Sequence, residues 1–373
     1  MEKFPKKLEI FRRVTSSGNY LPEIDGLRFI AIFLVLLSHV STFFVDRDRI
    51  DFNPNYLEAV LFNGVWGVSL FFIISGFVIG LQFTKNNKLS SSQLKKYFLR
   101  RLIRLEPPYI VALLIFFFLY IYVVKKYSFF ELLPHLIASA FYLHDIIYQK
   151  HSFVFTAAWS LEVEIQLYIL APLLSLLVFI RNKWLDVFLL LLCFTAYQLF
   201  YNNYYNVYIL FSFGDFLFGM LMAKHFAHRK FHLKNYWLNS ITGVISFIAF
   251  IIIPYHVPVF LILIKQMFLF LFFFLSLQNG ILKKVLSKNL FTLIGGMCYS
   301  IYLIHYIPLV SIGNILMRYF NMHNYYKNLL MGLIILIPAI IICGSIFYLL
   351  IEKPCMQYGR YKKTFSLKTE SFK

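Results

Sequence analysis

Long apolar runs alternate with short polar segments along almost the whole chain. Ten of these runs approach or reach the roughly 18–20 residues that a helix needs to cross a bilayer. The pattern predicts an all-α fold: a polytopic integral membrane protein with about ten transmembrane helices around a polar cavity. The predicted spans are 27–45, 64–83, 107–124, 159–180, 184–200, 206–223, 237–253, 257–277, 290–311 and 328–350.

The basic residues fall mainly on one side of this predicted arrangement. Of the 36 Lys and Arg, 27 lie in the two terminal tails and the even-numbered loops, and 7 lie in the odd-numbered loops. Because Lys and Arg accumulate on the cytoplasmic side, both termini are predicted to be cytoplasmic. The domains are then an N-terminal tail (1–26), a membrane domain (27–350) and a basic C-terminal tail (351–373).

Composition excludes several other classes of protein. With 60% hydrophobic residues and 44 Phe, the chain does not resemble a soluble domain. The net charge of +19 is spread over every inner loop, which argues against a nucleic-acid partner. The first 26 residues are polar and basic, so no cleavable signal peptide is expected, and the first span acts as the insertion signal. The four cysteines form no CxxC pair or Cys/His cluster, so neither a disulfide framework nor a metal site is predicted.

Two ionisable residues mark the first span. Arg28 and His39 are eleven positions apart, and Ser38 is the one polar residue between them. On a helix their side chains point in directions that differ by about 20° around the axis, so they share one face, and they lie about 16 Å apart along the axis. Arg28 therefore lies at the mouth of the span, just after Asp25, and His39 lies near the midplane. Ionisable groups at such positions are costly, and the default interpretation is functional.

Two further stretches bring small or basic residues to the helix ends. The stretch Gly67–Phe77 contains Ser75, and its small residues permit close helix packing, which is the simpler interpretation for most of it. Arg101 and Arg104 share a helix face at the cytoplasmic end of the third span. Their planar guanidinium groups suit phosphate binding. The alternative is an anchor for lipid headgroups.

Polar side chains also enter the fourth and ninth spans. Ser160, Glu164 and Tyr168 form one stripe beside Trp159. The Glu164 carboxylate needs a partner in space, for which His39 or an arginine is the natural candidate; the alternative is a structural hydrogen-bond network. Tyr302 and His305 share a face of the ninth span, and a second histidine in the membrane favours a shared polar cavity.

The longest outer loop, 125–158, contains an amphipathic stretch from Glu131 to Ile147 with His135, His144 and Asp145. It is the best predicted docking place for an outer substrate, and an interfacial helix without chemistry is the alternative.

Taken in order, these stretches resemble acyltransferase family 3, which includes bacterial O-acetyltransferases of cell-surface polysaccharides. The resemblance covers about residues 20–356, and its strength lies in six motifs in sequence. The matching segments are Ile24–Arg28 followed by His39, Gly67–Phe77, Arg101–Pro107, Trp159–Tyr168, Tyr299–His305 and Ile351–Pro354.

The resemblance implies a membrane-bound O-acyltransferase in the bacterial cytoplasmic (inner) membrane. It would transfer an acetyl group from cytoplasmic acetyl-CoA, a co-substrate, to a hydroxyl of an extracytoplasmic sugar or polysaccharide, without a permanently bound cofactor or metal. In this scheme His39 is the general base or the acyl-accepting nucleophile, and Glu164 orients its imidazole. Arg28, Arg101 and Arg104 bind the phosphates of acyl-CoA. The supporting or cavity-lining residues are Asp25, Ser75, Trp159, Ser160, Tyr168, Tyr302 and His305.

Two departures from the family and two other functions qualify this prediction. Position 69 is Ser where members often carry Asp. Many relatives carry a C-terminal extracytoplasmic hydrolase-like domain, whereas this chain ends about twenty residues after the last predicted span. An acceptor-delivery module would then be a separate protein, or none is needed. The alternatives are a transporter or flippase of an acyl group or lipid-linked glycan without chemistry of its own, and N-acylation. The acceptor stays open.

Overall fold

The computed structural model describes residues 6–13, 20–48, 56–84, 90–200, 208–228, 233–254, 257–320 and 325–357, and their regular structure is entirely helical. Most elements are α-helices; η1 is a 3-10 helix, and η2 and η3 are π-helical segments. The elements are η1 (Lys6–Phe11), α1 (Pro22–Asp48), α2 (Tyr56–Leu61), α3 (Val65–Phe83), α4 (Ser91–Phe118), η2 (Leu119–Val123), α5 (Phe129–Ala140), α6 (His144–Tyr148), α7 (Ala158–Val178), α8 (Lys183–Phe200), α9 (Tyr208–Ala227), α10 (Tyr236–Ile252), α11 (Val259–Ser276), α12 (Ile281–Leu286), α13 (Asn289–Gly296), α14 (Cys298–Ile304), α15 (Tyr306–Phe320), α16 (Tyr325–Phe347) and η3 (Tyr348–Glu352).

Five helices in the described part of the chain are long and apolar enough to cross a membrane, or six if one bent pair is a single span. The all-α prediction is confirmed, and a helix occupies each of the ten predicted ranges where it is described. The count of ten spans is not confirmed. One reason is length, because α10 and the Phe260–Ser276 part of α11 are apolar but shorter than 18 residues. The five spans are Pro22–Val45, Ala59–Phe83, Ser91–Val123, Ala158–Val178 and Tyr325–Gln357.

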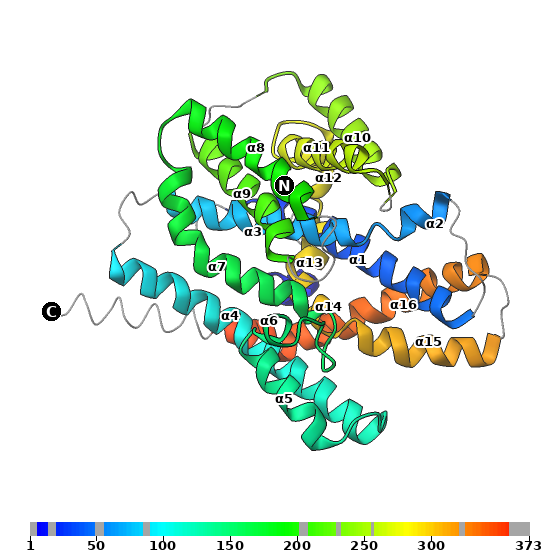
Figure 1. The fold of residues 1–373 in the computed structure, drawn as a ribbon. Helices are drawn as coiled ribbons and strands as arrows, with labels where there is room; N and C mark the ends of the chain where they lie inside the picture. The colour runs from blue at the N-terminus through cyan, green and yellow to red at the C-terminus, as the bar shows by residue number, and fades with distance from the viewer. Residues whose placement is uncertain are drawn as a thin grey trace.

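Helix α1 runs from the middle of the bundle toward its edge, in contact with α3, α13 and α16 (Figure 1). Its first turns fit tightly against α13, because a Cβ atom added to Gly295 would lie 1.7 Å from the Asp25 carbonyl oxygen. Only glycine permits this approach of two backbones. The contact fixes where Asp25, and Arg28 one turn later, enter the bundle.

Helices α3 and α9 form another close contact. A Cβ atom on Gly76 would lie 2.0 Å from the Phe216 carbonyl oxygen. Small residues let membrane helices pack at such short distances. The geometry agrees with the packing interpretation of this part of the Gly67–Phe77 stretch, and it holds Ser75 beside α7.

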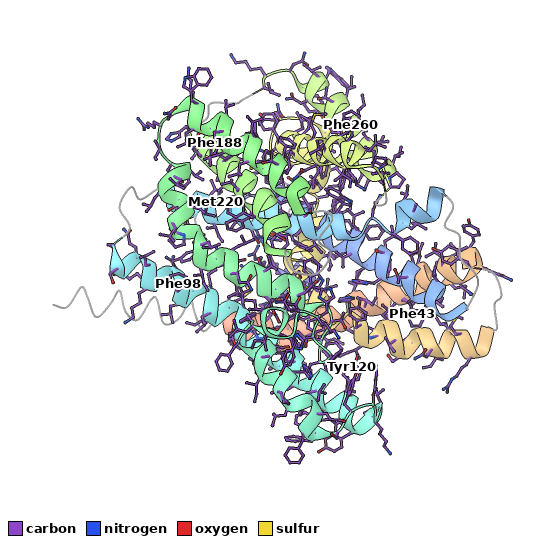
Figure 2. The ribbon with its side chains drawn as sticks, in the orientation of Figure 1. Phe43, Phe98, Tyr120, Phe188, Met220 and Phe260 are labelled. Atoms are coloured by element: carbon purple, nitrogen blue, oxygen red, sulfur yellow. The ribbon has the colours of Figure 1, made fainter. Side chains whose placement is uncertain are left out.

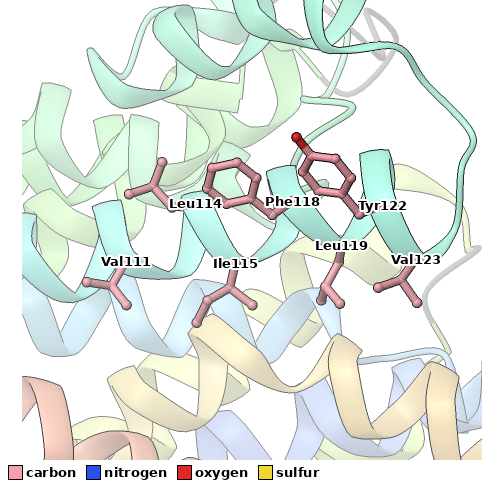
Figure 3. A pocket seen from close by; sticks show the side chains of 7 residues that line it. All are labelled: Val111, Leu114, Ile115, Phe118, Leu119, Tyr122 and Val123. Carbon is pink, nitrogen blue, oxygen red and sulfur yellow. The ribbon is translucent and has the colours of Figure 1, made fainter.

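The surface of the bundle is apolar, as expected of a chain that spans a membrane. Figure 2 labels Phe188 and Phe260, which are 59% and 69% exposed, near the edge of the bundle, whereas Met220 is fully buried. The pocket in Figure 3 is an open hollow of about 480 Å³ on the flank of α4 and η2. Its lining is almost wholly apolar and contains none of the predicted site residues: Val111, Leu114, Ile115, Phe118, Leu119, Tyr122 and Val123.

The ninth predicted span is broken. Helices α14 and α15 meet at an angle of 54°, and His305 is the single residue between them. The bend therefore falls on one of the candidate site residues.

Candidate functional site

Four arginines gather around the beginning of α1 and the adjacent part of α4. We call Arg13, Arg28, Arg101 and Arg104 the arginine cluster. Asp25 is 1% exposed, and one of its carboxylate oxygens accepts hydrogen bonds from the guanidinium groups of both Arg28 and Arg13. The distance from Nη1 of Arg13 to Oδ1 of Asp25 is 3.0 Å. The carboxylate thus joins the N-terminal segment to α1.

The other arginines lie close enough to interact with this pair. Arg104 is within electrostatic range of Arg13, Arg28 and Arg101, and of the Glu352 carboxylate. Glu352 is fully buried and accepts a hydrogen bond of 2.6 Å from the Ser300 hydroxyl. The closing motif of the sequence therefore returns to the beginning of α1 and supplies a second carboxylate there.

Positive charge exceeds negative charge in this cluster. Asp25 and Glu352 offset two of the four arginines, and counting Glu164, near Arg101, still leaves one excess cation. Two guanidinium nitrogens, Nη2 of Arg101 and Nε of Arg104, are buried without a hydrogen-bond partner among the described residues. Buried cations with unpaired donors are costly. The arrangement is suited to an anion with several acceptor oxygens.

Arg13 lies before the first span and is charged. Burial by itself would lower the pKa of Arg13, but the Asp25 carboxylate beside it leaves that pKa above its ordinary value. The guanidinium therefore keeps its proton at neutral pH and contributes a full charge to the cluster.

A second group of residues surrounds His39, farther along α1. We call His39 and His305 the histidine pair, since their ring centroids are 5.1 Å apart. The Tyr306 hydroxyl lies 3.1 Å from Nδ1 of His39. Nδ1 of His305 lies 2.6 Å from the Tyr302 carbonyl oxygen, which assigns the proton to Nδ1 and leaves Nε2 as an acceptor. That Nε2 is buried with no hydrogen-bond partner in the described part of the chain.

Hydroxyl groups connect the histidine pair to the beginning of α7. The Tyr302 hydroxyl donates to the Ala157 carbonyl at 2.9 Å and lies 2.7 Å from the Ser160 hydroxyl. Trp159, next to Ser160, has its ring centroid 5.9 Å from that of His151 in the 125–158 loop. The predicted residues Trp159, Ser160 and Tyr302 therefore lie between the loop and the histidine pair.

Glu164 contacts other residues than the predicted His39. Its carboxylate accepts hydrogen bonds from the Ser75 hydroxyl at 2.7 Å and from the Tyr168 hydroxyl. The Arg101 guanidinium lies over the Tyr168 ring, 4.9 Å from its centroid. Glu164 faces α3 and the arginine cluster, whereas His39 faces α14 and α15. The sequence offered His39 or an arginine as the partner of Glu164. The structure places Glu164 nearer to an arginine, Arg101, with Tyr168 in contact with both.

The 125–158 loop holds a compact polar group on α5 and α6. Nδ1 of His135 lies 2.9 Å from Nε2 of His144, and Nδ1 of His151 lies 3.1 Å from the Asp145 carboxylate. Burial raises the pKa of Asp145, but hydrogen bonds from His144 and His151 lower it more, so the carboxyl stays ionised. Glu162 of α7 accepts the Asp145 backbone N–H at 3.0 Å and ties this group to the helix that carries Ser160. No group of described His, Cys, Asp and Glu side chains could hold a metal ion.

Three residues of these groups were missed from the sequence. Arg13 was counted as a topology signal in a polar tail, and Glu352 was part of a motif without a role. Tyr306 directly follows His305 and faces it across the helix break, with ring centroids 4.5 Å apart. Its position directly after the Tyr299–His305 motif was the available signal, but a continuous helix would have turned it away from His305 by about 100°.

The comparisons with known proteins agree with the sequence motifs. The family model described as an acyltransferase domain matches residues 21–348. The chain belongs to acyltransferase family 3. No solved structure matches it.

The similar curated proteins are named as O-acetyltransferases. The chain is 31% identical to "Peptidoglycan O-acetyltransferase OatA" of Listeria monocytogenes over 191 residues, which are 46% of this chain and 26% of that protein. It is 27% identical to "Putative O-acetyltransferase SACOL0978" of Staphylococcus aureus over 328 residues, which are 77% of this chain and 50% of that protein. The chain thus spans half or less of the length of these relatives. The family and the helices make it a multi-pass membrane protein.

Proposed function

We propose that this protein is an O-acetyltransferase of the bacterial cytoplasmic membrane. It transfers the acetyl group of cytoplasmic acetyl-CoA to a hydroxyl of an extracytoplasmic sugar or polysaccharide. The observation that carries the proposal is that α1 links an anion-binding group, the arginine cluster around Arg28, to an imidazole pair that contains His39. The family and the O-acetyltransferase names of its relatives support the same reaction class.

The arginine cluster binds the phosphates of the donor. Its excess positive charge and the unpaired nitrogens of Arg101 and Arg104 suit phosphate oxygens, which accept bidentate hydrogen bonds from guanidinium groups. His39 lies about 16 Å along α1 from Arg28. The pantetheine arm has a reach of the same order, so a donor held at the cluster presents its thioester to the histidine pair.

The histidine pair handles the proton of the acceptor hydroxyl. His39 removes this proton as the hydroxyl oxygen attacks the thioester carbonyl carbon, forming a tetrahedral intermediate. The carbon–sulfur bond then breaks, and the leaving thiolate takes the proton from the imidazolium, giving the acetyl ester and CoA. His305 supports this step, because its unprotonated Nε2 is a second proton acceptor within the pair.

Glu164 acts on the donor side of this scheme. It holds the Tyr168 hydroxyl, and the ring of Tyr168 supports the Arg101 guanidinium by a cation–π contact. The acceptor approaches from the 125–158 loop, past Trp159 and Ser160. An indole beside a polar group is a common surface for a sugar ring, because it offers an apolar face and nearby hydrogen-bond partners.

The test is acetyl transfer by the purified chain in proteoliposomes. Acetyl-labelled acetyl-CoA is supplied on the side of the arginine cluster, and soluble muropeptides are the first acceptor probe, chosen from the name of the Listeria relative. We expect release of free CoA and base-labile label on the acceptor. A transporter without chemistry would move label without forming an ester on any acceptor of a wider glycan panel, and this result would refute the proposal. Label on the protein in the absence of acceptor would make His39 a nucleophile rather than a base.

A further inference from the structure

The N-terminal segment from η1 to Arg13 is folded against the bundle. The Tyr348 hydroxyl donates to the Arg12 carbonyl at 3.1 Å, and the Lys353 ammonium donates to the Ile10 carbonyl. Both donors belong to the chain segment that follows α16. The backbone on either side of Phe11, which packs against the apolar core, is therefore held in place next to Glu352.

This anchoring directs Arg13 into the arginine cluster. The Arg13 side chain is 12% exposed, almost the same as the 11% of Arg28, although Arg28 belongs to a helix and Arg13 to a tail. A Cβ atom added to Gly296 would lie 3.3 Å from the Cβ atom of Arg13, so α13 also packs against Arg13. Its neighbour Arg12 is exposed, with its guanidinium over the Tyr20 ring.

Neutralising Asp25 does not by itself require Arg13. Arg28 already donates to the same carboxylate oxygen, and the Tyr20 hydroxyl also interacts with the Asp25 carboxylate. A second guanidinium on one oxygen supplies the cation by which the four arginines exceed the three nearby carboxylates of Asp25, Glu352 and Glu164. Excess buried charge of this kind is stabilised by a ligand of opposite charge.

Resting on the proposed function, we propose that Arg13 is a fourth cation of the donor site and that its ligand is the phosphate-bearing part of an acyl-CoA. The Arg13 side chain then forms part of one wall of the donor site. It is held there by its ion pair with Asp25 and by the Tyr348 hydroxyl, which bonds the backbone carbonyl just before it.

The test compares three donors in the full-length protein. Acetyl-CoA carries all the phosphates, 3′-dephospho-acetyl-CoA lacks one, and acetyl-pantetheine lacks all of them. We expect Arg13→Ala to raise the KM for acetyl-CoA about tenfold, the effect of losing one charge-assisted hydrogen bond. The KM for acetyl-pantetheine should change less than twofold, because that donor has no phosphate to lose. Arg12→Ala, which removes the same charge one position away, is the matched control and should leave both KM values unchanged.

Arg13→Lys separates charge from shape and covers the case in which the alanine variant does not fold. Lysine keeps the ion pair with Asp25 and loses the planar fork, so the KM for acetyl-CoA should rise by less than in Arg13→Ala. An equal rise in the KM for acetyl-CoA and for acetyl-pantetheine in either variant would overturn the proposal, since Arg13 would then only hold Asp25 in position. Unchanged KM values in both variants would overturn it as well.

Calorimetric titration with CoA distinguishes this proposal from the proposed function. If the wild-type chain binds CoA but transfers no acetyl group, and Arg13→Ala weakens that binding about tenfold, the assignment of Arg13 stands and acetyl transfer fails. If the wild-type chain binds no CoA, both are overturned.

Discussion

The arginine cluster and the histidine pair each take one residue from α1, Arg28 and His39, and their surroundings differ in charge. At the cluster, Asp25 and Glu352 sit among four arginines, and charge is abundant. At the pair, the Nδ1 atoms of the two imidazoles meet uncharged groups, the Tyr306 hydroxyl at His39 and the Tyr302 carbonyl oxygen at His305. Fixed charges hold a charged ligand, whereas neutral imidazoles can take up and release a proton. In the proposed function, this contrast separates donor binding at the arginine cluster from proton transfer at the histidine pair.

The sharpest test of this separation is His39→Ala. Removing a general base costs typically about 10²–10⁴-fold in rate, so kcat should fall by that factor while the KM for acetyl-CoA stays within about twofold. Initial rates of CoA release would measure both constants. Comparable kcat in the variant and the wild type would remove His39 from the chemistry, and folding is controlled by the helical circular dichroism of the purified variant.

The complementary test removes two cations of the cluster. Arg101→Ala combined with Arg104→Ala should raise the KM for acetyl-CoA by about 10–100-fold, as expected for losing charge-assisted hydrogen bonds to phosphate, with a smaller change in kcat. Arg100→Ala is the matched control, because Arg100 is exposed and bonds the Lys96 carbonyl. A change confined to the acceptor KM would place the donor elsewhere.

Glu164→Gln decides to which of the two groups Glu164 belongs. Its contacts with Ser75 and Tyr168 predict a rise of up to about tenfold in the KM for acetyl-CoA, through a less firmly held Arg101, and an unshifted pH profile of kcat. A kcat profile displaced along the pH axis with an unchanged donor KM would instead restore the role predicted from the sequence, orientation of the His39 imidazole.

Tyr306→Phe tests the contribution of the Tyr306 hydroxyl to kcat, for which we expect the smallest of these effects. It removes a hydroxyl bonded to His39 and keeps the ring that packs on the pair. A net hydrogen bond of about 1 kcal/mol corresponds to a change of about fivefold, so kcat should fall by that amount. A loss as large as that of His39→Ala would show that the tyrosine takes part in the chemistry itself.

Much of the architecture followed from the sequence, because apolar run length and motif order are local properties. The helices and the grouping of Arg28, Arg101 and Arg104 were predicted in this way. The sequence offered His39 or an arginine as the partner of Glu164 and did not decide between them, because a stripe on one helix does not state which neighbour it faces. Arg13 was missed for a related reason: a tail residue acquires its environment only when distant segments, here the one after α16, fold against it.

The break at His305 links backbone shape to proton position. In the interior of a continuous helix the Tyr302 carbonyl is normally engaged by a backbone amide four residues later. Here the 54° bend brings that oxygen to the His305 ring instead, and this one bond decides which ring nitrogen carries hydrogen. A substitution that straightened the segment would therefore change which nitrogen of the His305 ring carries hydrogen, although it replaced no reactive side chain. The tautomer of His305 is thus set by the path of the backbone at this bend.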